Sequence, residues 1–157
     1  MTNAEDSGGA LVELAIAASL FLLLLLGSMD FADLFSTKMT LQNAVRQAGR
    51  YAITGQCLTN PNGTCKLSRY NSIVQTLQDS SVGLLNSSNS SDIAITCTNN
   101  GGGCPNNAGG PGDIITITVT YTYNFMTGPI GKFFTGGSYT IVVSSAFSNE
   151  PFPPGQS

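Results

Sequence analysis

An apolar run from Ala10 to Met29 constrains this chain more than any other feature, and it holds a single charged residue, Glu13. An α-helix rises about 1.5 Å per residue, so about 20 residues cross a hydrocarbon core of about 30 Å. The run therefore predicts a membrane span. A secretory signal peptide is the alternative. Against it, Glu5 and Asp6 precede the run without any basic residue, and no clear small-residue cleavage site follows it.

The helical pattern continues beyond the run. Apolar residues recur at helical spacing from Phe31 to Ala52, and charged or amide residues occupy the other faces. We expect one helix from Ala10 to about Ile53, with its first half in lipid and its second half amphipathic. Thr54 and Gly55 form a plausible stop.

Besides Lys38, two acids and two arginines follow the run on this helix. Asp30 and Asp33 stand on the first turns beyond it, and we expect solvated side chains there, with pairing between packed helices as the alternative. Arg46 and Arg50 are four residues apart, which is typical of a solvated helix face.

The rest of the chain is rich in Ser, Thr, Asn and Gly, and its apolar residues fall into shorter patterns. Residues 68–79 predict a short second helix. Alternating apolar and polar residues predict strands over 114–125, 138–147 and 92–98. The loop at 126–137 is too long for a tight hairpin and contains Gly and Pro.

A small antiparallel sheet must cover its apolar face, and the amphipathic half of the long helix offers the available surface. In the longest strand that face carries Ile115, Ile117, Val119, Tyr121, Tyr123 and Phe125. We therefore predict an α+β fold in which a long N-terminal transmembrane and amphipathic helix carries a small antiparallel β-sheet and a short second helix.

The four cysteines form two local pairs, Cys57 with Cys65 and Cys97 with Cys104, each enclosing a Gly/Asn-rich turn. Three connectivities are open to four cysteines, but short loops close at low entropic cost, which favours local disulfides. A zinc site is disfavoured because neither pair has the usual spacing and the chain has no histidine.

The orientation in the membrane is read from two opposing signals. Lys38, Arg46 and Arg50 follow the run and no basic residue precedes it, which would place the C-terminal part in the cytoplasm. Disulfides form in oxidising compartments and place that part outside the cytoplasm. We give the cysteines more weight.

Three triplets, at Asn62, Asn86 and Asn89, fit the glycosylation acceptor pattern. This pattern is common by chance in a chain so rich in Asn and Ser, and glycosylation stays open.

Composition argues against two function classes. Only 10% of residues are charged and the net charge is −3, so the chain has no electrostatic basis for binding nucleic acid. Histidine, the commonest general acid-base residue, is missing. The available acids, Asp79, Asp92, Asp113 and Glu150, stand apart without a linking motif. We expect no enzyme, no cofactor and no metal site.

Glu13 is the sharpest candidate functional residue. At the bilayer edge its carboxylate could reach the headgroups. Alternatively, it is a charge that pairs with a neighbouring molecule. A cut between Gly8 and Gly9 would free an α-amine and make Glu13 the fifth residue. The amine and the carboxylate of adjacent, staggered helices could then neutralise each other in an apolar core. Paired glycines alone are also common in flexible N-terminal tails.

The stretch "GGALVELAIAASLFLLLLLGSMDFADLFSTKMTLQNAVRQAGRYA" resembles the N-terminal region of TadE-like pseudopilins of the tight-adherence pilus system, a type IV-related pilus. The shared features are a Gly-ended leader, an ALVE-type motif, a Leu-rich run, a Gly followed by an acidic residue, and a closing segment here written "LQNAVRQAGRYA". The strands near the end of the chain also look like those of the family. Basic residues are common at the end of family leaders, whereas this leader ends in Glu5, Asp6 and Ser7 before Gly8.

The resemblance implies a prepilin-type precursor in the bacterial inner membrane, with a single pass and an extracytoplasmic C-terminal domain. A prepilin peptidase would cut between Gly8 and Gly9, and Glu13 would serve peptidase recognition or subunit alignment. Its partners would be other pilins or copies of itself, the inner-membrane assembly platform and motor, and lipid before assembly. The assembled pilus would be extracellular and serve adhesion.

The leading function is therefore a pilin-like protein that primes, caps or joins a filament. One alternative is the main self-polymerising subunit, and a second is a membrane-anchored extracytoplasmic binding domain or enzyme. The predicted parts of the chain are a leader (1–8), a transmembrane and assembly segment (9–29), an amphipathic half-helix (30–54) and a head domain (55–157).

Overall fold

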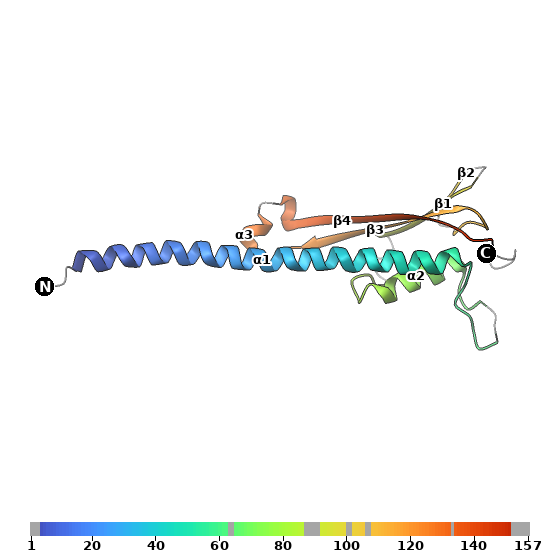
Figure 1. Ribbon diagram of the computed structural model, residues 1–157, viewed down its shortest axis with the longest axis horizontal. Helices are drawn as coiled ribbons and strands as arrows, with labels where there is room; N and C mark the ends of the chain where they lie inside the picture. Colours follow the sequence, from blue (N-terminus) through green and yellow to red (C-terminus); the bar gives the residue numbers. More distant parts are fainter. Residues whose placement is uncertain are drawn as a thin grey trace. The chain divides into compact units, whose positions relative to one another are not determined.

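The computed structural model describes residues 4–62, 65–86, 92–99, 102–105, 108–132 and 134–151. Its elements are α1 (Ala4–Ile53), α2 (Arg69–Ser80), β1 (Ile93–Asn99), β2 (Gly102–Pro105), β3 (Ile114–Asn124), α3 (Gly128–Gly131), a 3-10 turn η2 (Thr135–Gly137) and β4 (Ser138–Ser148) (Figure 1). The chain forms two compact units: unit 1 is Met1–Phe35 with Tyr123–Tyr139, and unit 2 is Ser36–Thr122 with Thr140–Ser157. The α+β prediction is confirmed.

Helix α1 begins six residues earlier than expected and ends where expected. Its last turn closes at Gly55, whose φ of 67° lies in the left-handed region that glycine adopts without strain. The N–H of Gly55 donates to the Ala52 carbonyl at 3.2 Å, and the Thr54 hydroxyl donates to the Tyr51 carbonyl at 2.8 Å. These bonds satisfy carbonyls that the helix end would otherwise leave open.

The core of unit 2 is built on the second half of α1. One face of the helix is buried and consists mostly of small or β-branched residues, and the strands add apolar residues at every second position. The buried set is Leu41, Ala44, Val45, Ala48 and Ala52 on α1, Ile73 and Leu77 on α2, and Ile93, Ile95, Ile115, Ile117 and Val119 on the strands. The predicted alternation of the longest strand is confirmed, since its buried residues alternate with more exposed ones over most of its length. Successive side chains point to opposite faces, and only one face meets the core.

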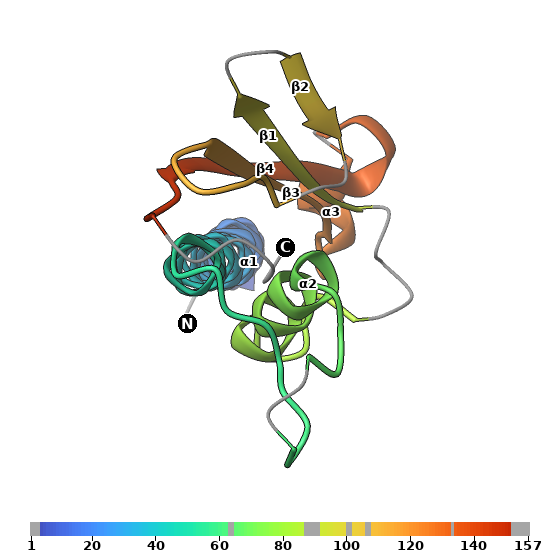
Figure 2. The same ribbon diagram turned by 90° about the vertical axis from the view of Figure 1, so that its right-hand side faces the viewer.

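The sheet has the strand order β2-β1-β3-β4. Strand β1 is antiparallel to both β2 and β3, with Ile95 opposite Ile117 in the β1–β3 register. Strands β1, β3 and β4 match the predicted ranges, whereas β2 was not predicted. In Figure 2 helix α2 lies beside the C-terminal part of α1, below the strands.

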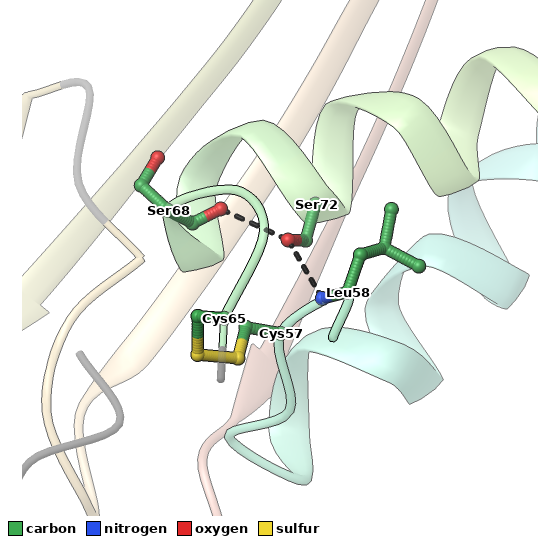
Figure 3. The surroundings of a disulfide bond; sticks show 5 residues. All are labelled: Cys57, Leu58, Cys65, Ser68 and Ser72. Atoms are coloured by element: carbon green, nitrogen blue, oxygen red, sulfur yellow. Dashed lines mark hydrogen bonds between the residues drawn. A yellow bond between two sulfur atoms is a disulfide. The ribbon is translucent and has the colours of Figure 1, made fainter. Parts of the chain in front are cut away.

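Helix α2 and the segment before it are fixed by local bonds. Cys57 and Cys65 form a disulfide with a Cα–Cα distance of 5.6 Å (Figure 3). The hydroxyl of Ser72 accepts the N–H of Leu58 and donates to the Ser68 carbonyl, both at 3.0 Å. Through Ser72 the first turn of α2 therefore holds the chain beside the disulfide.

Arg69, the first residue of α2, is buried and joins two further segments of unit 2. Its guanidinium donates to the Ala52 carbonyl at 2.7 Å, near the end of α1, and to the Gly109 carbonyl. Burial lowers the pKa of Arg69, and the charge of Asp113 works in the opposite direction.

Candidate functional site

Residues 10–26 of α1 form an exposed apolar surface, and within the rest of the apolar run Gly27 is buried. The most apolar stretch of 18 residues on this helix has a mean hydropathy of 2.5, and none of it is buried. The exposed large apolar residues on it are Leu11, Val12, Leu14, Ile16, Leu20, Phe21, Leu22, Leu23, Leu24, Leu25, Leu26 and Met29. Soluble monomers rarely expose so large a patch. Length and composition fit a single-pass membrane anchor.

The residues predicted for processing and assembly lie at the start of this surface. Gly8, Gly9 and Glu13 all belong to α1 and are exposed. A Cβ added at either glycine would have no atom within 4 Å. Gly9 and Glu13 are four residues apart and therefore lie on the same helix face. Among the described residues, none gives the Glu13 side chain a hydrogen bond or an ion pair.

Asp30 lies just beyond the apolar run and is only 3% exposed. Its carboxylate accepts the backbone N–H of Met126 at 3.2 Å, the N–H of Thr127 at 3.1 Å, and the Thr127 hydroxyl. The expectation of a solvated Asp30 was wrong. The segment after β3 folds back onto α1 and replaces the water that an isolated helix would offer.

These bonds also set the charge state of Asp30. The Thr127 hydroxyl lowers the pKa of the Asp30 carboxyl most, burial works in the opposite direction, and the N–H groups of Thr127 and Met126 lower it further. Asp30 therefore stays ionised and fully bonded next to the apolar run, and it fixes the end of β3 to the helix.

Asp33, one turn further along, is exposed but not purely solvated. Its carboxylate accepts the hydroxyl of Tyr123 at 3.0 Å, and that hydroxyl also lies 3.3 Å from the Asp30 carbonyl. Phe125 stacks on Phe134 with a centroid distance of 4.4 Å, and it meets Phe31 of α1 edge to face at 6.4 Å. Polar and aromatic contacts together attach the β3–β4 connection to α1 within unit 1.

The other predicted residues lie in unit 2. Besides the Cys57–Cys65 disulfide, Cys97 is disulfide-bonded, and the β1–β2 register sets it opposite Cys104, whose side chain is outside the described set. Arg46 and Arg50 are exposed, as expected.

Of the glycosylation triplets, Asn62 and Asn86 are exposed, and Asn89 lies outside the described residues. Of the four scattered acids, Asp113 accepts the N–H of Gly110 at 2.7 Å in a turn before β3. Within the described ranges no three His, Cys, Asp or Glu side chains cluster as metal ligands would.

Comparison with known proteins identifies one part of the chain. Residues 8–50 match the family model of the TadE-like proteins. Neither the curated proteins nor the solved structures gave a match. The matched segment contains Gly8, Gly9, Glu13, the apolar run and Asp30. Residues 8–50 are thus similar to the TadE-like proteins, and this similarity suggests a pilus-associated, pilin-like protein.

Proposed function

We propose that this protein is a structural subunit of an extracellular pilus, a minor pilin or pseudopilin that primes, caps or joins the filament. It is inserted in the bacterial inner membrane through residues 10–29 and cut by a prepilin peptidase between Gly8 and Gly9. The observation that carries the proposal is the exposed apolar run at residues 10–29 of α1, whose one carboxylate, Glu13, lies on the same face as Gly9.

The mechanism is physical and not catalytic. When α1 leaves lipid and packs against other helices, one apolar environment replaces another, so the hydrophobic effect contributes little to the transfer. Dispersion contacts and a pair between Glu13 and the freed amine of an adjacent subunit supply direction and register. Breaking a buried charge pair by removing one partner costs about 3–5 kcal/mol, so a subunit out of register is strongly disfavoured. An assembly motor supplies the remaining work.

The second half of α1 has a different task. Its buried face is committed to unit 2, and Asp30 is committed to the β3–β4 connection. The first half is therefore left for contacts with other pilus components, while the rest of the helix carries the head.

The experiment replaces Glu13 by glutamine in the full chain and measures the protein in membranes and in sheared filaments by quantitative mass spectrometry. Glu5→Gln is the matched control, because Glu5 lies in the leader and would be absent from the mature chain. We expect Glu13→Gln to remain in membranes and to fall roughly tenfold or more in filaments, since its amine partner loses the charge it needs. Glu5→Gln should incorporate like the wild type. Equal incorporation of Glu13→Gln would contradict the pairing mechanism.

A further inference from the structure

An apolar groove of about 530 Å³ lies in unit 1 between α1 and the β3–β4 connection. It is lined by Leu23, Leu24, Gly27, Ser28 and Phe31 of α1 and by Ile130 and Phe134 of the connection. The one polar side chain in this set, Ser28, donates its hydroxyl to the Leu25 carbonyl of its own helix at 2.8 Å. The groove therefore offers an apolar occupant an almost wholly apolar lining.

The groove overlaps the predicted membrane span in depth. At about 1.5 Å per residue, Gly27 lies about 3 Å and Leu23 about 9 Å before Met29, the last residue of the run. Ile130 packs directly on the helix at this level, because its Cδ1 is 2.9 Å from the position of a Cβ on Gly27. The connection therefore reaches the level of the last two turns of the apolar run.

Several polar groups at this level have hydrogen-bond partners within unit 1. Asp30 is held by Met126 and Thr127, and the N–H of Gly131 donates to the Thr127 carbonyl at 3.0 Å. Polar groups near hydrocarbon are costly unless they find such internal partners. The exposed residues of the connection suit an interface: Met126 is 85% exposed, and Lys132 has a stem long enough to reach headgroups.

We propose that the described residues of the connection from Phe125 to Gly137 are immersed in the membrane–water interface at the C-terminal end of the span, and that the groove takes an acyl chain of a bilayer phospholipid. The proposal rests on the membrane insertion proposed above. Interfacial elements sink about 5–10 Å into the boundary between headgroups and acyl chains, which matches the depth of the groove. Continuity with the span favours lipid as the occupant, because the same face of α1 that lines the groove continues into the uncovered apolar run.

The inference makes the β3–β4 connection a second membrane contact besides α1. The aromatic rings of Phe31, Phe125 and Phe134 then sit at the depth where proteins concentrate aromatic side chains. Before assembly, such a contact would hold unit 1 at the bilayer surface and shield the end of the apolar run.

The chain has no tryptophan, so a single introduced tryptophan reports one position. The full chain is reconstituted at one molecule per lipid nanodisc, with phosphatidylcholine brominated either near the carbonyls or near the chain ends. Phe134→Trp reports the groove and Leu20→Trp reports the middle of the span. Met126→Trp reports the connection at a site too exposed to disturb packing, and Val142→Trp is the solvent-exposed control in unit 2.

We expect Phe134→Trp and Met126→Trp to lose most of their emission with shallow bromines and less with deep ones. Leu20→Trp should show the reverse order, and Val142→Trp should lose little in either lipid. If Leu20→Trp is quenched but neither reporter in the connection is, the protein is inserted and the immersed connection is refuted. If Leu20→Trp is not quenched, membrane insertion itself fails and the proposal fails with it. If Leu20→Trp and Met126→Trp are quenched but Phe134→Trp is not, the connection meets the membrane but the groove does not take lipid, and the groove is refuted as the lipid site.

Discussion

Replacing Gly49 with alanine sets helix propensity against packing in the half of α1 that carries unit 2. Gly49 is buried, and the ring of Phe147 on β4 lies where a methyl group on Gly49 would go. Three ring atoms stand closer to that position than a Cβ tolerates, so the ring or the strand must shift.

The two effects have opposite signs and similar sizes. Alanine in a helix interior gains about 1 kcal/mol over glycine. Overpacking a well-filled contact costs about 1–3 kcal/mol. Here the obstacle is a rigid ring against backbone and not the end of a flexible chain, so we place the cost in the upper half of that range. We expect a net loss of about 1–2 kcal/mol in the free energy of unfolding, which for a chain of 157 residues is about 2–8 °C in the melting temperature.

The assay is thermal unfolding of the full chain in detergent micelles, followed by near-ultraviolet circular dichroism of its 5 tyrosines. Asn43→Ala, at an exposed position of the same helix, is the control and should gain a few tenths of a kcal/mol from propensity alone. Phe147→Leu should relieve the clash, so the double variant should show a coupling of about 0.5–3 kcal/mol. A Gly49→Ala protein as stable as the wild type would refute the close packing of β4 on α1.

Three further predictions concern single contacts. Thr127→Val removes the hydroxyl that lowers the pKa of Asp30 most. Because that pKa is depressed in the fold, the ionised carboxylate stabilises the fold above about pH 4, and this stabilisation is lost as the pH falls. The variant should therefore be less stable at neutral pH and lose less on acidification, and melting curves that stay parallel from about pH 7 to about pH 2 would contradict this. Replacing both Cys57 and Cys65 by serine should lower the free energy of unfolding in denaturant by about 2–3 kcal/mol, which is the loop entropy of a disulfide with a sequence separation of 8. An unchanged free energy of unfolding would show that the loop is ordered without the disulfide. Arg69→Met should lower the free energy of unfolding by about 1–3 kcal/mol in the same assay, because two buried carbonyls lose their donor. Arg69→Lys should recover only part of this stability, since one ammonium cannot match the two-pronged geometry of the guanidinium. Full recovery by lysine would argue against the contact with both carbonyls.

Much of the fold follows from local pattern. The long helix and its stop at Thr54 and Gly55, the second helix and three of the strands were predictable because each has the periodicity or turn chemistry of its element. Strand β2 was not predictable in this way. Its sequence "GGCP" has no alternation, and it becomes a strand only by pairing with β1, where Cys104 lies opposite Cys97.

The site was predictable only in part, for a related reason. The uncovered apolar run, Gly8, Gly9 and Glu13 are read from consecutive residues. The environment of Asp30 depends on Met126 and Thr127, which are almost a hundred positions away in the sequence. One signal was present: Tyr123 was expected on the face of its strand that packs against the helix, so a hydroxyl near the acids of the first turns could have been anticipated. The groove beside Ile130 had no such signal, because it forms only when the β3–β4 connection folds onto α1.

The central claim is that the helix is cut before Gly9 and assembles through its bare apolar half. The most direct test is intact mass with N-terminal sequencing of the chain, taken in parallel from membranes and from sheared filaments. The account predicts that the filament form begins at Gly9, with the uncut form confined to membranes. A filament form that retains residues 1–8 would contradict it, because Glu13 would then have no freed amine at Gly9 with which to pair.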